Sequence, residues 1–407
     1  MKLNDLCELI VDCEHKTAPI QEEGYPSIRT PNIGRGYFLL NGVNRVSPEI
    51  YAEWTKRAVP QAGDLILARE APVGNVAVIP EGHQYCLGQR TVLIRPIAEK
   101  VYPDYLCYLL LTPELQGQLL GKAAGATVHH LNMKDIRALS IPDLPSLQVQ
   151  KQAASVIKAY DDLIATNQSR IALLEDAARR LYREWFVQLR FPGHESVPVK
   201  DGVPQGWERC SFADLVEVNP KTKFEKGVGR PFVEMAALSE NSMVILERSV
   251  RPISGGAKFK NGDTLFARIT PCTENGKTGF VQFLENDEAV ASGSTEFLVF
   301  RSAKVNPFWI YCISREPDFR EHAIRSMSGS DGRQRVNPKC FKDFATLKPP
   351  ADVLKQYEDV VSDGFVTIET LCEQNRALAQ ARDLLLPKLM SGQLDVSGIP
   401  LPDEVAA

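Results

Sequence analysis

The side chains best suited to binding chemistry in this sequence are cations, and they gather in one late segment. Residues 320–348 contain seven Lys or Arg against three Asp or Glu, a local net charge of +4. Such a cluster suits a phosphate-rich partner such as nucleic acid, but it is equally consistent with a solvated surface. The whole chain has a formal net charge of −4, which weighs mildly against nucleic-acid binding because such proteins are usually basic.

Motifs for catalysis or cofactor binding are not apparent. Gly276-Lys277-Thr278 comes nearest to a phosphate-binding loop, yet that loop also needs glycine at position 271, where the sequence has Pro271. We find no glycine-rich loop or Asn-Pro-Pro-Tyr-like tetrad of a methyltransferase, and no carboxylate–lysine cluster of a nuclease. The adjacent His129 and His130 lack a carboxylate or Cys at ligand spacing, so a loop contact or plain surface is favoured over a metal site. We predict that the chain is not an enzyme and has no catalytic residue, metal or cofactor.

The composition is that of an ordinary soluble globular protein, with 407 residues, 44% of them apolar and 24% charged. This length predicts two to four cores, on the order of one per 100–200 residues. The sequence contains neither a long apolar run nor a basic-then-apolar N-terminus, so we expect no membrane span and no secretory signal. Nine cysteines without a CxxC motif indicate a reduced, cytoplasmic protein with mostly buried thiols.

A long helix must position whatever the loops carry. Between residues 147 and 188, apolar side chains alternate at steps of three and four and no Pro or Gly intervenes, which is typical of a helix packed against one partner helix. At about 1.5 Å per residue the helix would be ~60 Å long. That exceeds what one compact domain needs, so we interpret it as a strut between two bodies. Its seam consists of Ile157, Tyr160, Ile164, Ile171, Leu174, Ala178, Leu181 and Trp185.

The partner helix is found 204 residues later in the same chain. The flanking pair Lys151-Gln152 recurs as Lys355-Gln356, and segment 63–69 is echoed by segment 262–268. An offset near half the chain length indicates an old duplication of a globular unit plus a helix. The equivalent seam positions are Val361, Gly364, Ile368, Asn375, Leu378, Arg382, Leu385 and Leu389.

The predicted fold is α+β: two similar domains around curved sheets, each followed by a long helix, with the helices packed as an antiparallel coiled coil about a pseudo-two-fold axis. Outside the framework positions the two domains differ strongly. Loops on a rigid scaffold are where recognition is placed, so we favour two different targets held at a fixed separation over neutral drift of the loops. The expected ranges are 1–145 (first domain), 146–190 (first helix), 191–350 (linker and second domain), 351–395 (second helix) and 396–407 (tail).

Three segments of the sequence carry a family resemblance. They are the helix segment 173–187 followed by Phe191-Pro192-Gly193, the tail 385–392, and the loop 267–278. Together with the duplicated organisation, they resemble the specificity (S) subunits of type I restriction-modification systems over essentially the whole chain. Any one of these pieces alone would be a weak signal.

The resemblance implies a role in DNA recognition. Each domain would be a target-recognition domain reading one half of a split double-stranded DNA sequence. The helices would set the length of the unread gap and dock two DNA methyltransferase (modification) subunits, and a restriction/translocase subunit would complete the assembly. The alternative is a non-enzymatic duplicated scaffold that binds other proteins. Trp185 and Phe186 could belong to the docking surface, although aromatic seam residues are more often core.

Candidate DNA contacts are cations, amides and small polar groups in the divergent loops. Arg69 and Arg268 are equivalent, so each is better suited to phosphate or the framework than to bases, whereas the unshared segment 333–335 is the better base reader. A surface ion pair is the plain alternative for every Arg. The candidates are Arg29, Arg35, Arg69, Thr127, His129 and Lys134 in the first domain, and Arg268, Lys277, Arg325, Arg333, Gln334 and Arg335 in the second.

The duplication also predicts the register of the helix pair. In an antiparallel pair centred on Ser169 and Glu373, Asn167 faces Asn375, and Tyr160 faces Arg382. A single buried Asn pair is a known means of fixing register at some cost in stability.

Overall fold

The computed structural model describes residues 1–123, 130–225, 227–252, 255–330 and 332–399. The chain divides into two compact units, Met1–Ile164 with Ala377–Ala407 (unit 1) and Ala165–Arg376 (unit 2). Each unit is taken separately below. None of the helices within the described ranges combines the length and the apolar character needed to cross a membrane.

Unit 1 is built on an antiparallel sheet whose inner strand β4 (Leu65–Ala68) is buried along its whole length. Leu65 and Leu67 belong to a core that includes helix α2 (Pro103–Leu110), while Ile66 and Ala68 face a second core around a smaller sheet. A strand covered on both faces has no polar side, which explains its unbroken apolar sequence. The main sheet has the order β1 (Cys7–Asp12), β7 (Thr91–Pro96), β4, β5 (Val76–Val78), and the smaller one β3 (Arg45–Val46), β2 (Tyr25–Ile28), β6 (Cys86–Leu87).

Helices α3 and α1 of unit 1 each begin with an N-cap side chain followed by a proline in the first turn. Helix α3 starts at Pro113, and the Thr112 hydroxyl accepts a hydrogen bond from the Leu115 amide as its N-cap. Helix α1 is capped in the same way by Ser47. The helical segments are η1 (Leu3–Leu6), η2 (Thr30–Asn32), α1 (Pro48–Trp54), α2 (Pro103–Leu110), α3 (Pro113–Lys122) and α4 (Met133–Arg137).

Unit 2 repeats this plan. Its main sheet runs β11 (Glu217–Val218), β18 (Phe297–Arg301), β15 (Thr264–Ala267), β16 (Thr278–Phe280), so that β15 takes the place of β4. The second sheet has the parallel pair β12–β17, as the smaller sheet of unit 1 has β2–β6, but it gains a further strand, β14. Its order is β13 (Ser249–Pro252), β12 (Gly229–Val233), β17 (Ala291–Gly293), β14 (Ala257–Phe259).

The remaining elements of unit 2 flank this core. A two-stranded sheet joins β10 (Glu208–Ser211) to β19 (Ala345–Lys348), and a hairpin joins β8 (Val199–Lys200) to β9 (Val203–Pro204). The helical segments are η4 (His194–Ser196), α6 (Phe212–Leu215), η5 (Met235–Ala237), α7 (Pro307–Ser314), α8 (Pro317–Arg325) and η6 (Pro338–Lys342).

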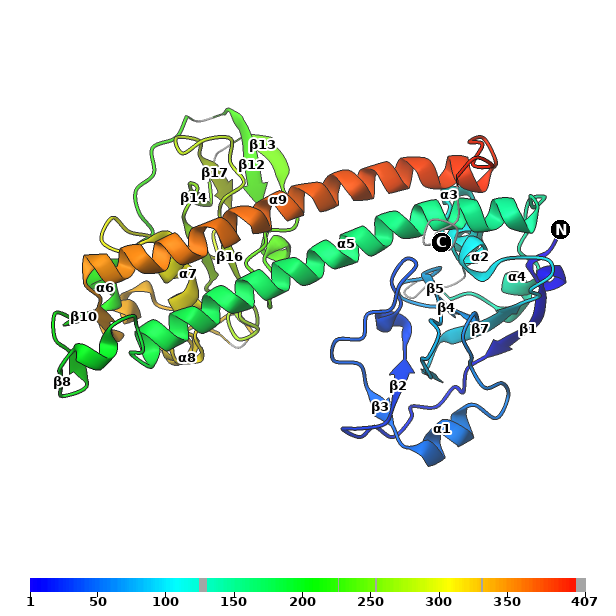
Figure 1. Ribbon diagram of the computed structural model, residues 1–407, viewed down its shortest axis with the longest axis horizontal. Coiled ribbons are helices and arrows are strands. Elements are labelled where there is room, and N and C mark those ends of the chain that lie inside the picture. Colours follow the sequence, from blue (N-terminus) through cyan, green and yellow to red (C-terminus); the bar gives the residue numbers. More distant parts are fainter. Residues whose placement is uncertain (124–129, 226, 253–254, 331, 400–407) are drawn as a thin grey trace. The chain divides into compact units, whose positions relative to one another are not determined.

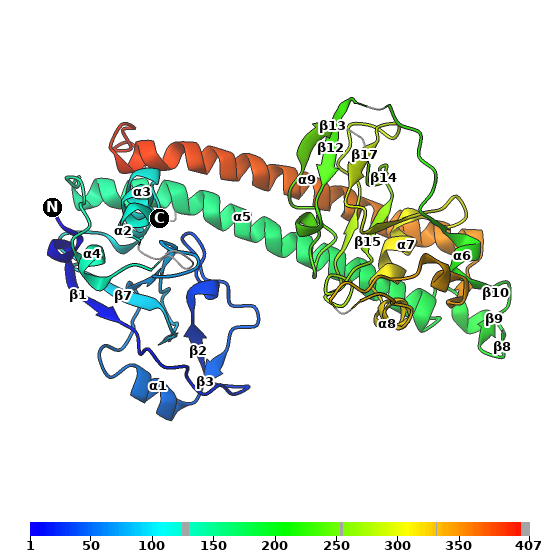
Figure 2. The same ribbon diagram turned by 180° about the vertical axis from the view of Figure 1, so that it is seen from behind.

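Two long helices complete the fold. Helix α5 (Leu147–Tyr182) continues as a wider turn over Arg183–Val187, and helix α9 (Ala351–Met390) contains Pro387 near its end. In both views the two helices run side by side (Figures 1 and 2). Their contacts show an antiparallel pair, because residue numbers rise along one helix as they fall along the other. Arg382 Nη1 donates to Asp161 Oδ1 at 2.7 Å in unit 1, and Asn167 Nδ2 donates to Asn375 Oδ1 at 3.0 Å in unit 2.

The predicted α+β fold with two similar domains, each followed by a long helix of an antiparallel pair, is therefore confirmed. The asparagines that the register places opposite each other are in direct contact, and Asn167 is only 2% exposed. Their role in fixing the register stays a prediction.

One buried carboxylate holds α5 to the domain of unit 2. Glu175 is 3% exposed and accepts hydrogen bonds from the Tyr311 and Ser242 hydroxyls and from the Met243 amide. The Met243 contact is 2.8 Å long. A buried carboxylate is tolerated when donors surround it in this way.

Candidate nucleic-acid interface

An arginine stands at the end of the equivalent strands β4 and β15 and holds the segment that returns from a variable loop. Arg69 Nε donates to the Leu131 carbonyl at 2.9 Å, and the Leu131 amide donates back to the Arg69 carbonyl at 3.1 Å. In unit 2, Arg268 Nη2 donates to the Val336 carbonyl at 3.1 Å, and the Val336 amide donates to the Arg268 carbonyl at 2.8 Å. Both arginines thus serve the framework, one of the two roles the sequence left open for them.

In unit 1 this arginine lies in a balanced charge network. Arg69 is 5% exposed; its Nη1 donates to Asp12, and its Nη2 contacts His130 Nε2 at 2.7 Å. His130 Nδ1 lies 2.8 Å from Glu70, which also pairs with Arg90 at 2.8 Å. Since an arginine N–H can only donate, His130 Nε2 must accept, so the ring is neutral with its proton on Nδ1, donated to Glu70. Two cations and two carboxylates cancel.

In unit 2 the same loop position carries a different side chain. Arg335 precedes Val336 as His130 precedes Leu131. Its Nε donates to both Glu296 oxygens at 2.9 Å, and its Nη2 donates to Oε1 at 2.7 Å. The hydrogen bond from Arg335 lowers the pKa of Glu296 and in turn raises the pKa of Arg335. The arginine is therefore held in one orientation while its side chain stays 43% exposed.

Glu296 also occupies a position equivalent to one in unit 1. Its carbonyl accepts a 2.9 Å hydrogen bond from the Arg268 amide, as the Arg90 carbonyl does from the Arg69 amide. The place of a cation in one unit is thus taken by an anion in the other. The backbone scaffold is shared, whereas the charges it presents at these two positions differ.

The other candidates of unit 1 are mostly surface residues. Arg29 is exposed just before η2, and Lys134 is exposed on α4. Arg35 is exposed but anchored, since its Nη2 donates to the Leu111 carbonyl at 2.9 Å. Thr127 and His129 lie outside the described residues.

In unit 2 the structure brings segment 268–270 together with Ser328 and segment 333–336. The Thr270 amide donates to the Gln334 carbonyl at 3.1 Å, and residue 335 bridges to 269 and 328. Arg333 is exposed and makes no side-chain hydrogen bond or ion pair within the described part of unit 2. Lys277 and Arg325 are engaged, the first with the Met235 carbonyl at 3.3 Å and the second with Glu321 at 3.1 Å.

The acidic partners were missed by sequence analysis. Asp12, Glu70 and Glu296 contact Arg69, His130 and Arg335, yet they lie 57, 60 and 39 residues away from those partners in the sequence. Only the strand-end position of Arg69 and Arg268 was a signal for this region. His130 was considered in the sequence, but as half of a His pair rather than as a partner of Arg69.

One group of side chains in unit 1 has the composition of a metal site. Among the described residues, Asp12, Cys13 and His15 place one ligand atom each within 4.8 Å of one another. Asp12 is already paired with Arg69, and burial raises the pKa of the Cys13 thiol, which disfavours the thiolate that a metal needs. These contacts give little support to a metal site.

Comparisons with known proteins agree with this architecture. Residues 1–176 match the model of the type I restriction modification DNA specificity domain. The chain is 24% identical over 380 residues to the type I restriction enzyme MjaIX specificity subunit of Methanocaldococcus jannaschii, covering 88% of this chain and 84% of that protein. It is 26% identical over 420 residues to the putative MjaX specificity subunit of the same organism, covering 97% and 93%.

The fold is also found among solved structures. The S subunit of a type I restriction-modification system from M. genitalium aligns with a TM-score of 0.57 over 96% of this chain and 95% of that one, at 13% identity. At that identity the likeness establishes the fold alone. Residues 1–176 thus match a type I restriction modification DNA specificity domain, and the chain is similar to type I specificity subunits over most of its length.

Proposed function

We propose that this chain is the sequence-specific DNA-recognition subunit of a type I restriction-modification complex, with each domain reading one half of a split double-stranded target. The observation that carries the proposal is the contrast at equivalent positions. One backbone scaffold presents His130 and Arg90 in unit 1 but Arg335 and Glu296 in unit 2. Two domains that recognise different DNA sequences need the same docking geometry but different side chains. A shared backbone scaffold with different side chains meets both needs.

Arg335 is the best candidate for a base contact. Glu296 holds the Nε–Nη2 edge of its guanidinium, so the remaining N–H groups are pre-oriented rather than free to rotate. Arginine donates two hydrogen bonds to guanine O6 and N7 in the major groove. The neighbouring Arg333, exposed and unengaged within the described part of unit 2, suits either a phosphate or a base.

The long helices are proposed to set the gap between the two half-sites and to dock the methyltransferase subunits. An uninterrupted helix pair changes length only by whole residues, and the Asn167–Asn375 hydrogen bond favours one register. Apolar side chains on the outer faces of the helices are exposed, including Leu173, Val360, Val366 and Leu384 at 61–68%. Such side chains suit a protein partner. A restriction/translocase subunit would complete the complex.

Trp185 and Phe186 do not support the docking role considered for them. They are 8% and 9% exposed and pack with Tyr357 at ring-centroid distances of 6.0 and 5.0 Å. Both belong to the core of unit 2, which was the plainer of the two interpretations.

The decisive experiment is methylome sequencing of cells that express this chain with its methyltransferase partner. The expected result is one split motif with a fixed gap. A hybrid in which residues 1–145 come from a relative should change one half of the motif and leave the other half and the gap unchanged. An undivided motif, or a hybrid that alters both halves, would contradict the proposal.

The scaffold alternative makes a different prediction for DNA binding. If the domains bind proteins instead, the purified complex should show no steep dependence of DNA affinity on salt. Phosphate contacts release counterions and give a slope of about −0.9 per neutralised phosphate in a plot of log affinity against log salt.

A further inference from the structure

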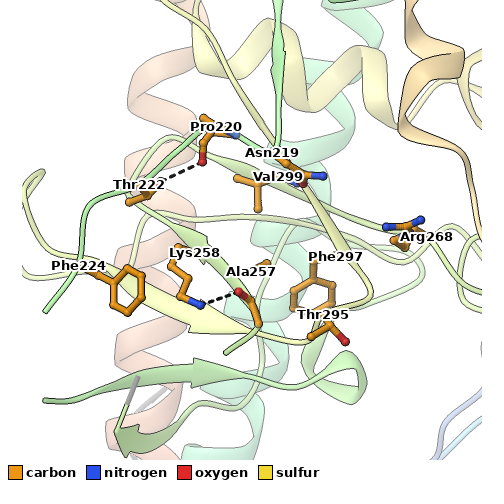
Figure 3. A pocket seen from close by; sticks show the side chains of 11 residues that line it. Asn219, Pro220, Thr222, Phe224, Ala257, Lys258, Arg268, Thr295, Phe297 and Val299 are labelled. Carbon is orange, nitrogen blue, oxygen red and sulfur yellow. Dashed lines mark hydrogen bonds between the residues drawn. The ribbon is translucent and has the colours of Figure 1, made fainter. Parts of the chain in front are cut away.

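A hollow of about 370 Å³ opens in unit 2 beside strands β14 and β18. Figure 3 shows Lys258 and Arg268 on opposite sides of it, with Phe297 between them. Asn219, Pro220 and Thr295 also line it, and none of the described residues that line it is acidic. The hollow lies next to the proposed DNA-reading loop, because Thr295 precedes the Glu296 that holds Arg335.

The counterpart of this hollow in unit 1 is filled by a carboxylate. Strand β1 runs on to Asp12, which pairs with Val92 and meets Arg69 Nη1. In unit 2, strand β11 ends at Val218 opposite Phe300. Counting along the equivalent strands places Pro220 where Asp12 stands in unit 1.

Asn219 explains why the chain leaves the sheet at this point. Its φ is +57°, a left-handed conformation that asparagine adopts more readily than most residues, and its Oδ1 accepts a 3.0 Å hydrogen bond from the Val299 amide. The chain therefore turns away before it could place a side chain against Arg268. The arginine is retained, but its carboxylate partner is not.

The Arg268 guanidinium is partly buried but is left with few hydrogen-bonding partners. Within the described part of unit 2 it forms no ion pair, Nη2 donates to the Val336 carbonyl, and Nε is enclosed without a hydrogen-bond partner. Glu296 is the carboxylate that acts on it electrostatically, but its hydrogen bonds go to Arg335. A desolvated cation without a close counter-charge gains from any anion that can enter.

The far side of the hollow is cationic as well. Lys258 Nζ lies 4.8 Å from the centre of the Phe224 ring and donates to the Gly255 and Gly256 carbonyls at 2.7 Å. Loss of hydration on burial lowers the pKa of the Lys258 ammonium group. Whereas the network of unit 1 is neutral, this region of unit 2 carries an excess of positive charge.

We propose that the Arg268 side of this hollow binds a phosphate oxyanion in the place that Asp12 fills in unit 1, and that the oxyanion is a backbone phosphodiester when DNA is bound. The donors would be the Arg268 guanidinium, the Thr295 hydroxyl and Asn219 Nδ2, which is free to donate because Oδ1 is the acceptor. The assignment to DNA rests on the proposed function; the oxyanion site itself does not. A phosphate contact adds affinity and positions the domain without choosing a sequence.

The first arm of the test uses inorganic phosphate and no DNA. Thermal unfolding of the full chain is followed as phosphate replaces chloride at constant ionic strength. Phosphate also stabilises proteins by exclusion from their surface, so the site-specific part is the difference between variants. A filled site should raise the Tm of the wild type by roughly 2–4 °C more than that of Arg268→Gln. Lys200→Gln, an exposed cation on the β8–β9 hairpin, is the matched control and should behave as wild type.

The variant Pro220→Asp tests the same site without removing Arg268, whose loss could itself lower the Tm because it holds the returning loop. Pro220→Asp restores a carboxylate at the position of Asp12, so it should raise the Tm without phosphate and remove the specific phosphate response. If wild type, Arg268→Gln and Pro220→Asp all respond equally to phosphate, the oxyanion site is ruled out.

The second arm identifies the source of the oxyanion. DNA affinity of the assembled complex is measured against salt for cognate duplexes and for duplexes with a scrambled second half-site. Arg268→Gln and Pro220→Asp should each make the slope of log affinity against log salt less steep by about one, on both duplexes. A specific phosphate response with unchanged slopes would support the site but assign it to free phosphate. A wild type that does not bind DNA would defeat the proposed function, while the first arm would still decide the site.

Discussion

Three equivalent positions join the long helices to the two domains, and they are polar in unit 1 but apolar in unit 2. In unit 1, the Tyr108 hydroxyl donates to Asp161 at 2.9 Å and Arg382 donates to the same carboxylate at 2.7 Å. At the offset of 204 the corresponding residues of unit 2 are Cys312, Phe365 and Ala178.

The apolar version is a tight aromatic cluster. Phe365 is 1% exposed, and its ring centroid lies 4.6 Å from Phe308 and 5.1 Å from Phe280. At the third position, the Ala178 carbonyl accepts a 3.1 Å hydrogen bond from the Tyr357 hydroxyl. The contact between the long helices and the domain is therefore built differently in the two units: a polar joint in unit 1 and an aromatic joint in unit 2. The first depends on charge and hydrogen bonding, and the second depends on burial, so they should fail under different perturbations.

The largest effect is expected from emptying the aromatic joint. Phe365→Ala should lower the free energy of unfolding of unit 2 by about 3–5 kcal/mol, because a buried phenyl ring is lost and a cavity remains. Urea unfolding followed by tryptophan fluorescence measures it. The neighbouring Val366 is 64% exposed, and Val366→Ala should cost less than about 0.5 kcal/mol. Equal losses for the two variants would remove the distinction between the joints.

The variable loop position offers the next comparison. Arg335→Ala should reduce discrimination at one base pair of the second half-site by about ten- to a hundredfold, since a bidentate base contact is lost. Arg333→Ala should weaken binding in the same range if it too reads a base. Competition binding on cognate and scrambled second half-sites checks both. A variant whose loss is equal on both duplexes touches phosphate instead.

His130→Ala is the matched change in unit 1. Because both ring nitrogens are engaged by Arg69 and Glu70, the substitution should destabilise unit 1 more than it changes base preference. Altered preference at the first half-site with unchanged stability would show that His130 reads DNA directly.

The polar joint should lose less than the aromatic one. Asp161→Asn keeps the shape but removes the charge, and it should cost about 1–2 kcal/mol as charge-assisted hydrogen bonds from Tyr108 and Arg382 become neutral. A double-mutant cycle with Arg382→Gln isolates the pair, and high salt should shrink the coupling energy. A coupling energy of zero at low salt would mean that the ion pair does not support the joint.

The smallest effect concerns pH. Arg335 holds the pKa of Glu296 below its ordinary value of 4.5. A depressed folded-state pKa means that the carboxylate contributes stability above the unfolded value and loses it as the pH falls through the folded value. The stability difference between wild type and Glu296→Gln should therefore be constant above about pH 5 and shrink below pH 4.5. A difference that grows on acidification would contradict this pairing.

The long-range plan could be predicted from the sequence because it is written in local periodicity. The seam from Ile157 to Trp185 specifies a helix turn by turn, and its recurrence at 204 residues identifies the partner. The register was right at Asn167 and Asn375. It was close at Arg382, which forms its ion pair with Asp161, one residue beyond the Tyr160 placed opposite it.

The site could be predicted only in part. The strand-end positions of Arg69 and Arg268 follow from the repeated segment, and both prove to hold the returning loop. Their surroundings could not be predicted, because a carboxylate such as Glu296 meets Arg335 only through the path of two loops, and no local pattern encodes that meeting. The hollow beside Arg268 depends in the same way on the turn at Asn219.

The three hydrogen bonds that the Glu175 carboxylate accepts limit how domains can be exchanged between chains of this kind. A domain exchanged into this chain inherits a charge in α5 that needs a tyrosine hydroxyl, a serine hydroxyl and one main-chain amide at matching places. A graft that omits Ser242 or Tyr311 would strand an anion in the protein interior. Crossover points that keep these donors with their helix should yield chimaeras that fold, whichever sequence the transplanted loops prefer.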